Sequence, residues 1–171
     1  MRLTTQRLTL EPISLAHLKS TYVYSSDLEN TRLMMFLPLE SMEETEACIR
    51  RSMDYWQSDA PEHLQFAVML NGTQIGDVTM YMDGPGNAEL GWILDRRFHG
   101  NGYACEAIRA VMDYGQRAWG IRRFFAMCDS ENVPSYRLME RLGMKRLPEV
   151  GKRKNRSSDE ERLELTYELV I

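Results

Sequence analysis

The stretch Arg97-Phe98-His99-Gly100-Asn101-Gly102-Tyr103-Ala104 follows an apolar run, Leu90 to Leu94, and opens a helix-like run that ends near Arg117. This order predicts a strand, a glycine turn and a helix. The first N–H groups of a helix have no partner within it, and the helix dipole places about half a positive charge there. Gly100 and Gly102 allow unusual dihedrals and a close approach of the backbone to an anion. The stretch therefore predicts a main-chain site for a pyrophosphate.

Two familiar phosphate loops do not fit this stretch. It lacks the Gly-Lys-Ser/Thr of a P-loop and the third glycine of a dinucleotide-binding G-x-G-x-x-G turn. What remains is Arg-x-x-Gly-x-Gly-x-Ala. Alone, a glycine pair before a helix also fits a structural turn without a ligand, so the neighbouring segments must decide.

Composition indicates one soluble globular domain over residues 1–171. The chain is 43% hydrophobic and 27% charged, and its N-terminus is polar, without the apolar core of a secretion signal. No apolar run approaches the ~18 residues of a membrane span. The net charge of -4 gives no general electrostatic reason to hold nucleic acid. We expect a cytoplasmic protein with neither nucleic-acid nor membrane partners.

The cysteines and histidines indicate neither disulfides nor a metal site. The cysteines are few, odd in number and widely spaced, and the histidines stand outside any ligand motif. These residues are Cys48, Cys105, Cys128, His17, His63 and His99.

The order of predicted elements indicates an α+β fold with one central sheet. Asn71-Gly72 is a strong hairpin signal, Ser14 and Ser41 or Glu43-Glu44 suit helix starts, and Lys152 to Glu161 is expected to be a mobile charged stretch. Periodicity predicts strands over 7–12, 64–70, 74–82, 88–94, 121–128 and 162–170, and helices after Ser14 and over 42–57, 102–117 and 134–143.

Four segments, in this order, resemble the GNAT N-acetyltransferases, in particular the branch that acetylates N-terminal amines of proteins, including ribosomal proteins. They are Leu3 to Leu10, Glu89 to Leu94, Gly100 to Ala107, and Asn132-Val133-Pro134-Ser135 with the later Leu142-Gly143-Met144. The resemblance implies a mixed, largely antiparallel twisted sheet of about six to seven strands flanked by about four helices. It also implies acetyl-CoA as the co-substrate.

The resemblance assigns the co-substrate site residue by residue. The backbone of Ile93 and Leu94 would pair with the pantetheine arm, and residues 97–104 would hold the pyrophosphate. Arg97 would meet a phosphate or lie solvated, and His99 would donate to phosphate. Asn132 and Ser135 would reach the pantetheine or thiol end; they also suit a helix N-cap pair, and both roles are compatible.

The implied reaction is direct attack of an amine on the thioester, without a covalent enzyme intermediate. Glu89 is the candidate base; the alternative is an ordinary glutamate on a solvated strand edge. A strand N–H, that of Ile93 or its neighbour, would stabilise the oxyanion. The family tyrosine that protonates the thiolate is replaced by Met139, which leaves Ser135 as the acid and Tyr136 as the alternative.

The acceptor is the least determined part of the prediction. The leading hypothesis is a protein N-terminal amine; the alternatives are a small amine such as a polyamine, amino acid or antibiotic, or a non-catalytic acyl-CoA-binding module. A homodimer is common in the family, but no residue pattern here predicts one. The residues that could line the acceptor pocket are Met34, Phe36, Trp56, Tyr81 and Trp92, with Glu40, Glu43, Glu44 and Glu46 as acidic neighbours.

Overall fold

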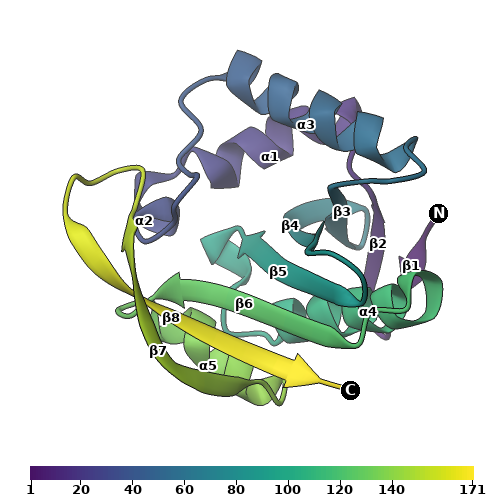
Figure 1. The fold of residues 1–171 in the computed structure, drawn as a ribbon. Helices are drawn as coiled ribbons and strands as arrows, with labels where there is room; N and C mark the ends of the chain where they lie inside the picture. Colours follow the sequence, from purple (N-terminus) through teal and green to yellow (C-terminus); the bar gives the residue numbers. More distant parts are fainter.

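A computed structural model describes all of residues 1–171. One sheet of eight strands runs through the molecule, in the order β1-β2-β3-β4-β5-β6-β8-β7 (Figure 1). The strands are β1 (Leu3–Thr4), β2 (Leu8–Pro12), β3 (His63–Leu70), β4 (Thr73–Met82), β5 (Asn87–Leu94), β6 (Arg123–Asp129), β7 (Lys145–Lys154) and β8 (Glu161–Val170).

Five α-helices cover the two faces of this sheet. α1 and α3 pack on one face, and α4 and α5 pack on the other (Figure 1). The helices are α1 (Leu18–Ser25), α2 (Leu28–Thr31), α3 (Met42–Trp56), α4 (Tyr103–Trp119) and α5 (Val133–Arg141), with short 3-10 turns at Leu15–His17 and Arg96–Phe98. No helix is both long and apolar enough to cross a membrane.

Every strand pair is antiparallel except β5 with β6, which run parallel. This pair is short: it covers only Asn87 to Glu89 on β5. Beyond Glu89 the strands separate, because β6 continues along β8 through Asp129 while β5 continues along β4 through Leu94. The sheet therefore opens into a wedge between β5 and β6.

The predicted α+β class and the largely antiparallel mixed sheet are confirmed. Asn71 and Gly72 have φ values of 50° and 81°, as the hairpin signal required. The predicted number of strands, about six to seven, was lower than the eight observed. β1 has only two residues, and β7 falls partly on the stretch expected to be mobile. β7 is an exposed edge strand rich in charge, so it lacks the apolar alternation from which strands are predicted.

Candidate functional site

The two faces of the central strands differ in chemistry. Met80 of β4 lies against α4: a Cβ added at Gly115 would be 2.6 Å from its sulfur. Because side chains alternate along a strand, Asp77, Thr79 and Tyr81 face the opposite way, toward α1 and α3. The cross-strand register places Glu89, Gly91 and Ile93 of β5 and His63 and Gln65 of β3 on that same face. The apolar core thus occupies the α4 side, and polar groups gather on the α1–α3 side.

One edge of β5 is open along the wedge. Asp83 N–H donates to the carbonyl of Asn87, and Arg123 N–H donates to the carbonyl of Gly86. Backbone groups alternate in direction along a strand, so those of the odd-numbered residues of β5 bond to β4 and those of the even-numbered residues face β6. The backbone of Ile93 consequently faces β4. The groups that face the wedge beyond the last β6 pair belong to Leu90, Trp92 and Leu94, which makes them the groups available to an amide-bearing ligand.

The glycine turn has the predicted geometry. Gly100 and Gly102 have φ values of 79° and 80°, in the left-handed region that favours glycine. Gly102 is the N-cap of α4, and the first bond within the helix runs from Glu106 N–H to the carbonyl of Gly102. The amides of Tyr103, Ala104 and Cys105 therefore precede the helical ladder and are free to bind an anion.

The N-terminal segment holds this turn in place. Arg7 donates from Nε to Glu106 at 2.7 Å and from a terminal nitrogen to the carbonyl of Asn101 at 3.0 Å. Its guanidinium also lies 4.6 Å from the centre of the Tyr103 ring, and the Thr5 hydroxyl donates to Glu106. Sequence reasoning missed this role of Arg7, since nothing local marks a contact almost a hundred residues away.

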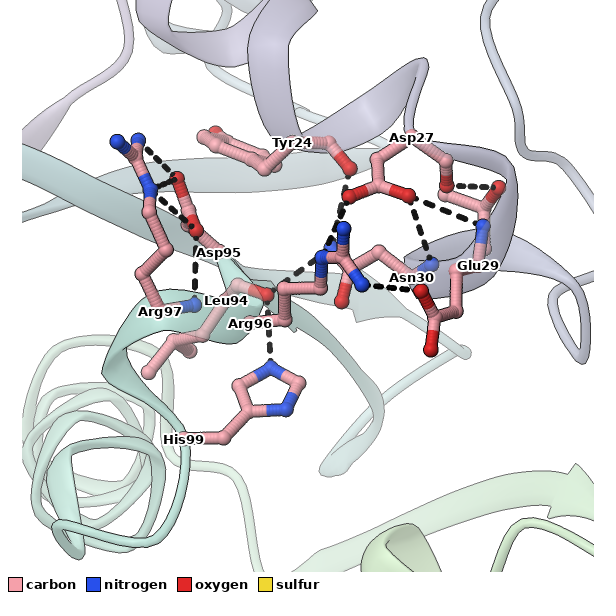
Figure 2. Close-up of polar contacts among 10 residues, drawn as sticks. Tyr24, Asp27, Glu29, Asn30, Leu94, Asp95, Arg96, Arg97 and His99 are labelled. Atoms are coloured by element: carbon pink, nitrogen blue, oxygen red, sulfur yellow. Dashed lines mark hydrogen bonds and ion pairs between the residues drawn. The ribbon is translucent and has the colours of Figure 1, made fainter.

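The residues between β5 and the turn bond both to one another and to the start of α2, where Arg96 pairs with Asp27 and Glu29 (Figure 2). Arg97 pairs with Asp95, at 2.5 Å, and lowers the pKa of that carboxyl through hydrogen bonds. The carbonyl of Leu94 accepts from His99 Nε2 at 2.9 Å and from Asn30 at 3.1 Å. A carbonyl can only accept, so His99 carries its proton on Nε2 there. The Nε2–H of His99 is therefore engaged within the protein.

The other residues of the turn support it from within. The Asn101 side chain donates to the carbonyls of Phe98 and His99, at 3.3 and 3.0 Å. Phe98, Tyr103 and Ala104 are partly buried against the hydrophobic core. The side chains of this turn therefore stabilise its shape, and its main-chain amides are the groups left for a ligand.

The start of α5 combines capping with a position in the cavity. The Asn132 side chain accepts from Ser135 N–H at 3.3 Å, so the predicted N-cap role is confirmed. Asn132 and Ser135 also line the large cavity described below. Tyr136 packs against the core and does not line that cavity, and Met139 is fully buried. Of the two candidate acids, Ser135 is the one placed at the cavity.

A cavity of about 730 Å³ lies between the polar face of the sheet and α1–α3 and reaches into the wedge. Its walls include Leu90 to Ile93 of β5 and Met127, Cys128 and Ser135 beyond the wedge. Of the predicted acceptor residues, Met34, Phe36, Tyr81 and Trp92 line it, whereas Trp56 packs edge-on against Phe66 instead. The cavity therefore extends from the open edge of β5 to the segment before α3 that holds Met34 and Phe36.

Glu89 lies in this cavity rather than on a solvated edge. Burial raises the pKa of its carboxyl, and the nearby Glu164 and Asp83 raise it further, against a lowering by Arg153. It is directly opposite Tyr81, whose own pKa is raised to about 12 by burial and by Asp77. A carboxyl with a raised pKa is a better proton acceptor near neutral pH than an ordinary one.

Asp77 is a second carboxyl of the cavity that sequence reasoning did not single out. It is only 6% exposed, and burial raises its pKa from 3.8 to about 6. The hydroxyl of the fully buried Tyr24 donates to it at 2.7 Å, and Gln65 also hydrogen-bonds to it. A burial pattern can predict an inward position but not that a carboxylate will occupy it.

The tip of the β7–β8 hairpin closes one side of the cavity. Arg156 pairs with Glu44 at 2.6 Å and with Glu40 at 3.4 Å, and its N–H donates to the carbonyl of Met34 at 3.1 Å. In Figure 1 the hairpin extends past β6 toward α2. We name these contacts of Arg156 the hairpin clasp. Two of the acidic residues noted in the sequence thus bind a cation of the protein itself.

Cys128 lies at the same cavity but is poorly suited to act as a nucleophile. It is buried, and burial raises the pKa of its thiol to about 11. The reactive form of a cysteine is the thiolate, which is scarce at neutral pH when the pKa is that high. The cavity therefore offers a carboxyl base and backbone donors, but no activated nucleophile.

Splayed central strands that line a cavity, with a glycine turn at the N-terminus of the following helix, are features of an acetyltransferase fold. The model of the Acetyltransferase (GNAT) domain matches residues 7–145, which is most of the chain. The chain therefore belongs to the GNAT family of N-acetyltransferases.

Relatives and solved structures agree with this assignment. The chain is 29% identical over 149 residues to the uncharacterized N-acetyltransferase YnaD of Bacillus subtilis (strain 168), covering 85% of the chain and 84% of YnaD. A GNAT-family acetyltransferase structure from Bacillus anthracis is 25% identical, with a TM-score of 0.83 and coverage of 99% and 98%. RimL, a ribosomal L7/L12 α-N-protein acetyltransferase solved with coenzyme A, shares the fold at 18% identity, with a TM-score of 0.86 and coverage of 100% and 98%.

Proposed function

We propose that the protein transfers an acetyl group from acetyl-CoA directly to a primary amine, for which the N-terminal amine of a protein is the first candidate and a small amine the second. One observation carries the proposal: a single cavity is lined by the open edge of β5 and by Glu89, a carboxyl with a raised pKa. The choice of a protein N-terminus is supported by the fold shared with RimL and by the resemblance of Leu3 to Leu10 to that branch.

The residues of the chain fit acetyl-CoA at two places. The wedge-facing C=O of Trp92 and the N–H of Leu94 would pair with the amides of the pantetheine arm, as an added strand would. The N–H groups of Tyr103, Ala104 and Cys105 would hold the pyrophosphate at the start of α4. Gly100 and Gly102 leave the space that this approach needs.

Bound acetyl-CoA supplies the acetyl group as a thioester: the amine nitrogen forms the new C–N bond, and the C–S bond breaks. Glu89 accepts the proton that the amine loses. The N–H of Trp92, which is the neighbour of Ile93 that faces the wedge, donates to the carbonyl oxygen as negative charge develops on it. The Ser135 hydroxyl, positioned by the cap at Asn132, donates a proton to the departing sulfur.

A small amine is a second candidate acceptor, and the hairpin clasp favours it. Arg156 fastens the hairpin tip to the segment before α3, which narrows access for a protein tail. The cavity of about 730 Å³ lies within the range of small-molecule sites. Both candidates share the same co-substrate site and the same base.

The proposal is tested by measuring acetyl transfer to a panel of peptides and small amines, with Glu89→Gln beside the matched control Glu149→Gln, whose side chain is exposed on β7. We expect Glu89→Gln to lower kcat/KM about 10²-fold while calorimetry shows unchanged affinity for acetyl-CoA. Full turnover by Glu89→Gln with every acceptor would refute the assigned base. No binding of acetyl-CoA by the wild-type protein would refute the proposed function itself.

A further inference from the structure

Asp77 is a buried charge without a counter-charge. It is 6% exposed, and no arginine, lysine or histidine pairs with it; its partners are the neutral side chains of Tyr24 and Gln65. Burying a carboxylate without a cation is unfavourable, and a bound cation would offset that cost. Asp77 also lines the cavity, so a ligand can reach it.

A β-bulge helps to aim the polar groups around Asp77. The pairing of β3 with β4 shifts between Val68 and Met69, which leaves Ile75 as an extra residue on β4. Because of this residue, Gln74 and Asp77 both face α1, although strict alternation would separate them. Gln74 donates to the Tyr24 hydroxyl at 2.9 Å, and that hydroxyl donates to Asp77. The bulge thus builds a support for the carboxyl.

The hydrogen bonds around Asp77 orient it and do not conduct protons. The Ser52 hydroxyl donates to the Gln65 side-chain oxygen at 2.7 Å and contacts His63 at 2.9 Å, while Gln65 bonds to Asp77. An amide such as Gln65 does not give up a proton, so the chain from His63 to Asp77 is interrupted there. Two donors fix the carboxylate, and its other acceptor positions are left for a bound cation.

The charge of the cavity favours a cationic ligand. Its walls carry five carboxylates and three guanidinium groups. Two of the arginines are already paired, Arg153 with Glu164 and Arg156 with Glu44. Asp77 and Glu89 have no arginine partner, so they are the two positions where a bound ammonium group would gain most.

Asp77 and Glu89 lie on one face at a fixed separation. Asp77 is opposite Ile93, which is four residues from Glu89 along β5, so the two positions are about 13 Å apart along the strand. Thr79, Gly91 and the ring of Tyr81, which lies over Gly91, form the surface between them. We propose that Asp77 binds a second ammonium group of the acceptor, so that the substrate is an extended diamine whose reacting amine lies at Glu89. This inference rests on the proposed acetyl transfer at Glu89 and takes the second candidate, the small amine, as the acceptor.

The test compares two acceptors of equal length, 1,8-diaminooctane and 8-amino-1-octanol, which differ in the charge of one end. Initial rates are measured for the wild-type protein, for Asp77→Asn, and for the exposed control Asp59→Asn. We expect the wild-type protein and Asp59→Asn to show a KM about tenfold lower for the diamine. We expect Asp77→Asn to lose this preference, so that its KM for the diamine approaches its KM for the amino alcohol.

A second variant, Tyr24→Phe, keeps the charge and removes one supporting donor, so a smaller loss of the preference is expected. Equal KM values for the two acceptors in the wild-type protein, or a KM raised equally for both by Asp77→Asn, would overturn the inference. Turnover of peptides but of neither octyl compound would overturn it while leaving the proposed acetyl transfer intact. Failure to acetylate any amine would instead defeat the proposed function.

Discussion

Replacing Asp77 with asparagine is expected to stabilise the protein above neutral pH. The pKa of Asp77 rises from 3.8 to about 6 on folding, because burial disfavours the charged form. At about 1.4 kcal/mol per pH unit, an ionised Asp77 costs the folded state about 3 kcal/mol. A carboxyl whose pKa is raised by folding adds no penalty below its unfolded pKa; the penalty grows as pH rises and is complete above the folded pKa.

The gain from the substitution is smaller than the penalty it removes. Asparagine has one acceptor oxygen in place of two, so one of the bonds from Tyr24 and Gln65 is lost, at about 1 kcal/mol. The net expectation is a variant about 2 kcal/mol more stable at pH 8, and equal to the wild-type protein near pH 4.5. For a chain of this size, the gain at pH 8 corresponds to roughly 4–8 °C in Tm.

Urea denaturation from pH 4.5 to pH 8 measures this difference directly. Asp59→Asn is the matched control, because it removes an exposed carboxylate and should leave the difference flat across the range. If Asp77→Asn is less stable than the wild-type protein at pH 8, the carboxylate is not an uncompensated buried charge, and the reasoning about its role fails with it.

Three further predictions concern the turn, the base and the hairpin clasp. Gly102→Ala, at a φ of 80°, should lower the free energy of unfolding by about 1–2 kcal/mol and weaken acetyl-CoA binding, measured by calorimetry, about tenfold or more. The control Gly84→Ala, at a φ of 73° in the β4–β5 turn, should lower the free energy of unfolding without affecting acetyl-CoA binding. The wild-type kcat/KM should fall as pH drops below the raised pKa of Glu89, and a Glu89→Gln profile with the same limb would contradict this. Arg156→Gln should speed hydrogen exchange at the hairpin tip and raise kcat/KM for peptides relative to small amines; an unchanged ratio would count against the hairpin clasp.

The sequence predicts those parts of the site that depend on local geometry. The positive φ of Gly100 and Gly102, the Asn71-Gly72 turn and the cap at Asn132 follow from residue types that few other conformations suit. The helix start at Tyr103 follows from the same signals, within one residue. Local chemistry is therefore enough to predict the glycine turn that we propose as the co-substrate site.

The acceptor side depends on contacts between distant segments, which no local pattern reports. Arg7 reaches Glu106 across 99 residues, and Asp77 meets Tyr24 across 53. β7 was not predicted because an exposed edge strand carries charged residues in place of alternating apolar and polar ones, and because a proline such as Pro148 is tolerated in an edge strand. The sequence also could not predict that the backbone N–H and C=O of Ile93 face β4, since this depends on which strand bonds to which edge of β5.

The alternating side chains of β4 separate the residues that stabilise the protein from those that line its cavity. From Gly76 to Met82, the even side chains pack toward α4 in the core, and the odd ones, Asp77, Thr79 and Tyr81, face the cavity. Trimming Met80 should therefore cost stability, by roughly 2–5 kcal/mol for alanine, with activity preserved in the folded fraction. Neutralising Asp77 should instead raise stability above neutral pH and weaken the binding of a cationic acceptor. The ionised Asp77 on this sheet face raises the free energy of the folded protein without a ligand, and a cationic acceptor would lower that free energy on binding.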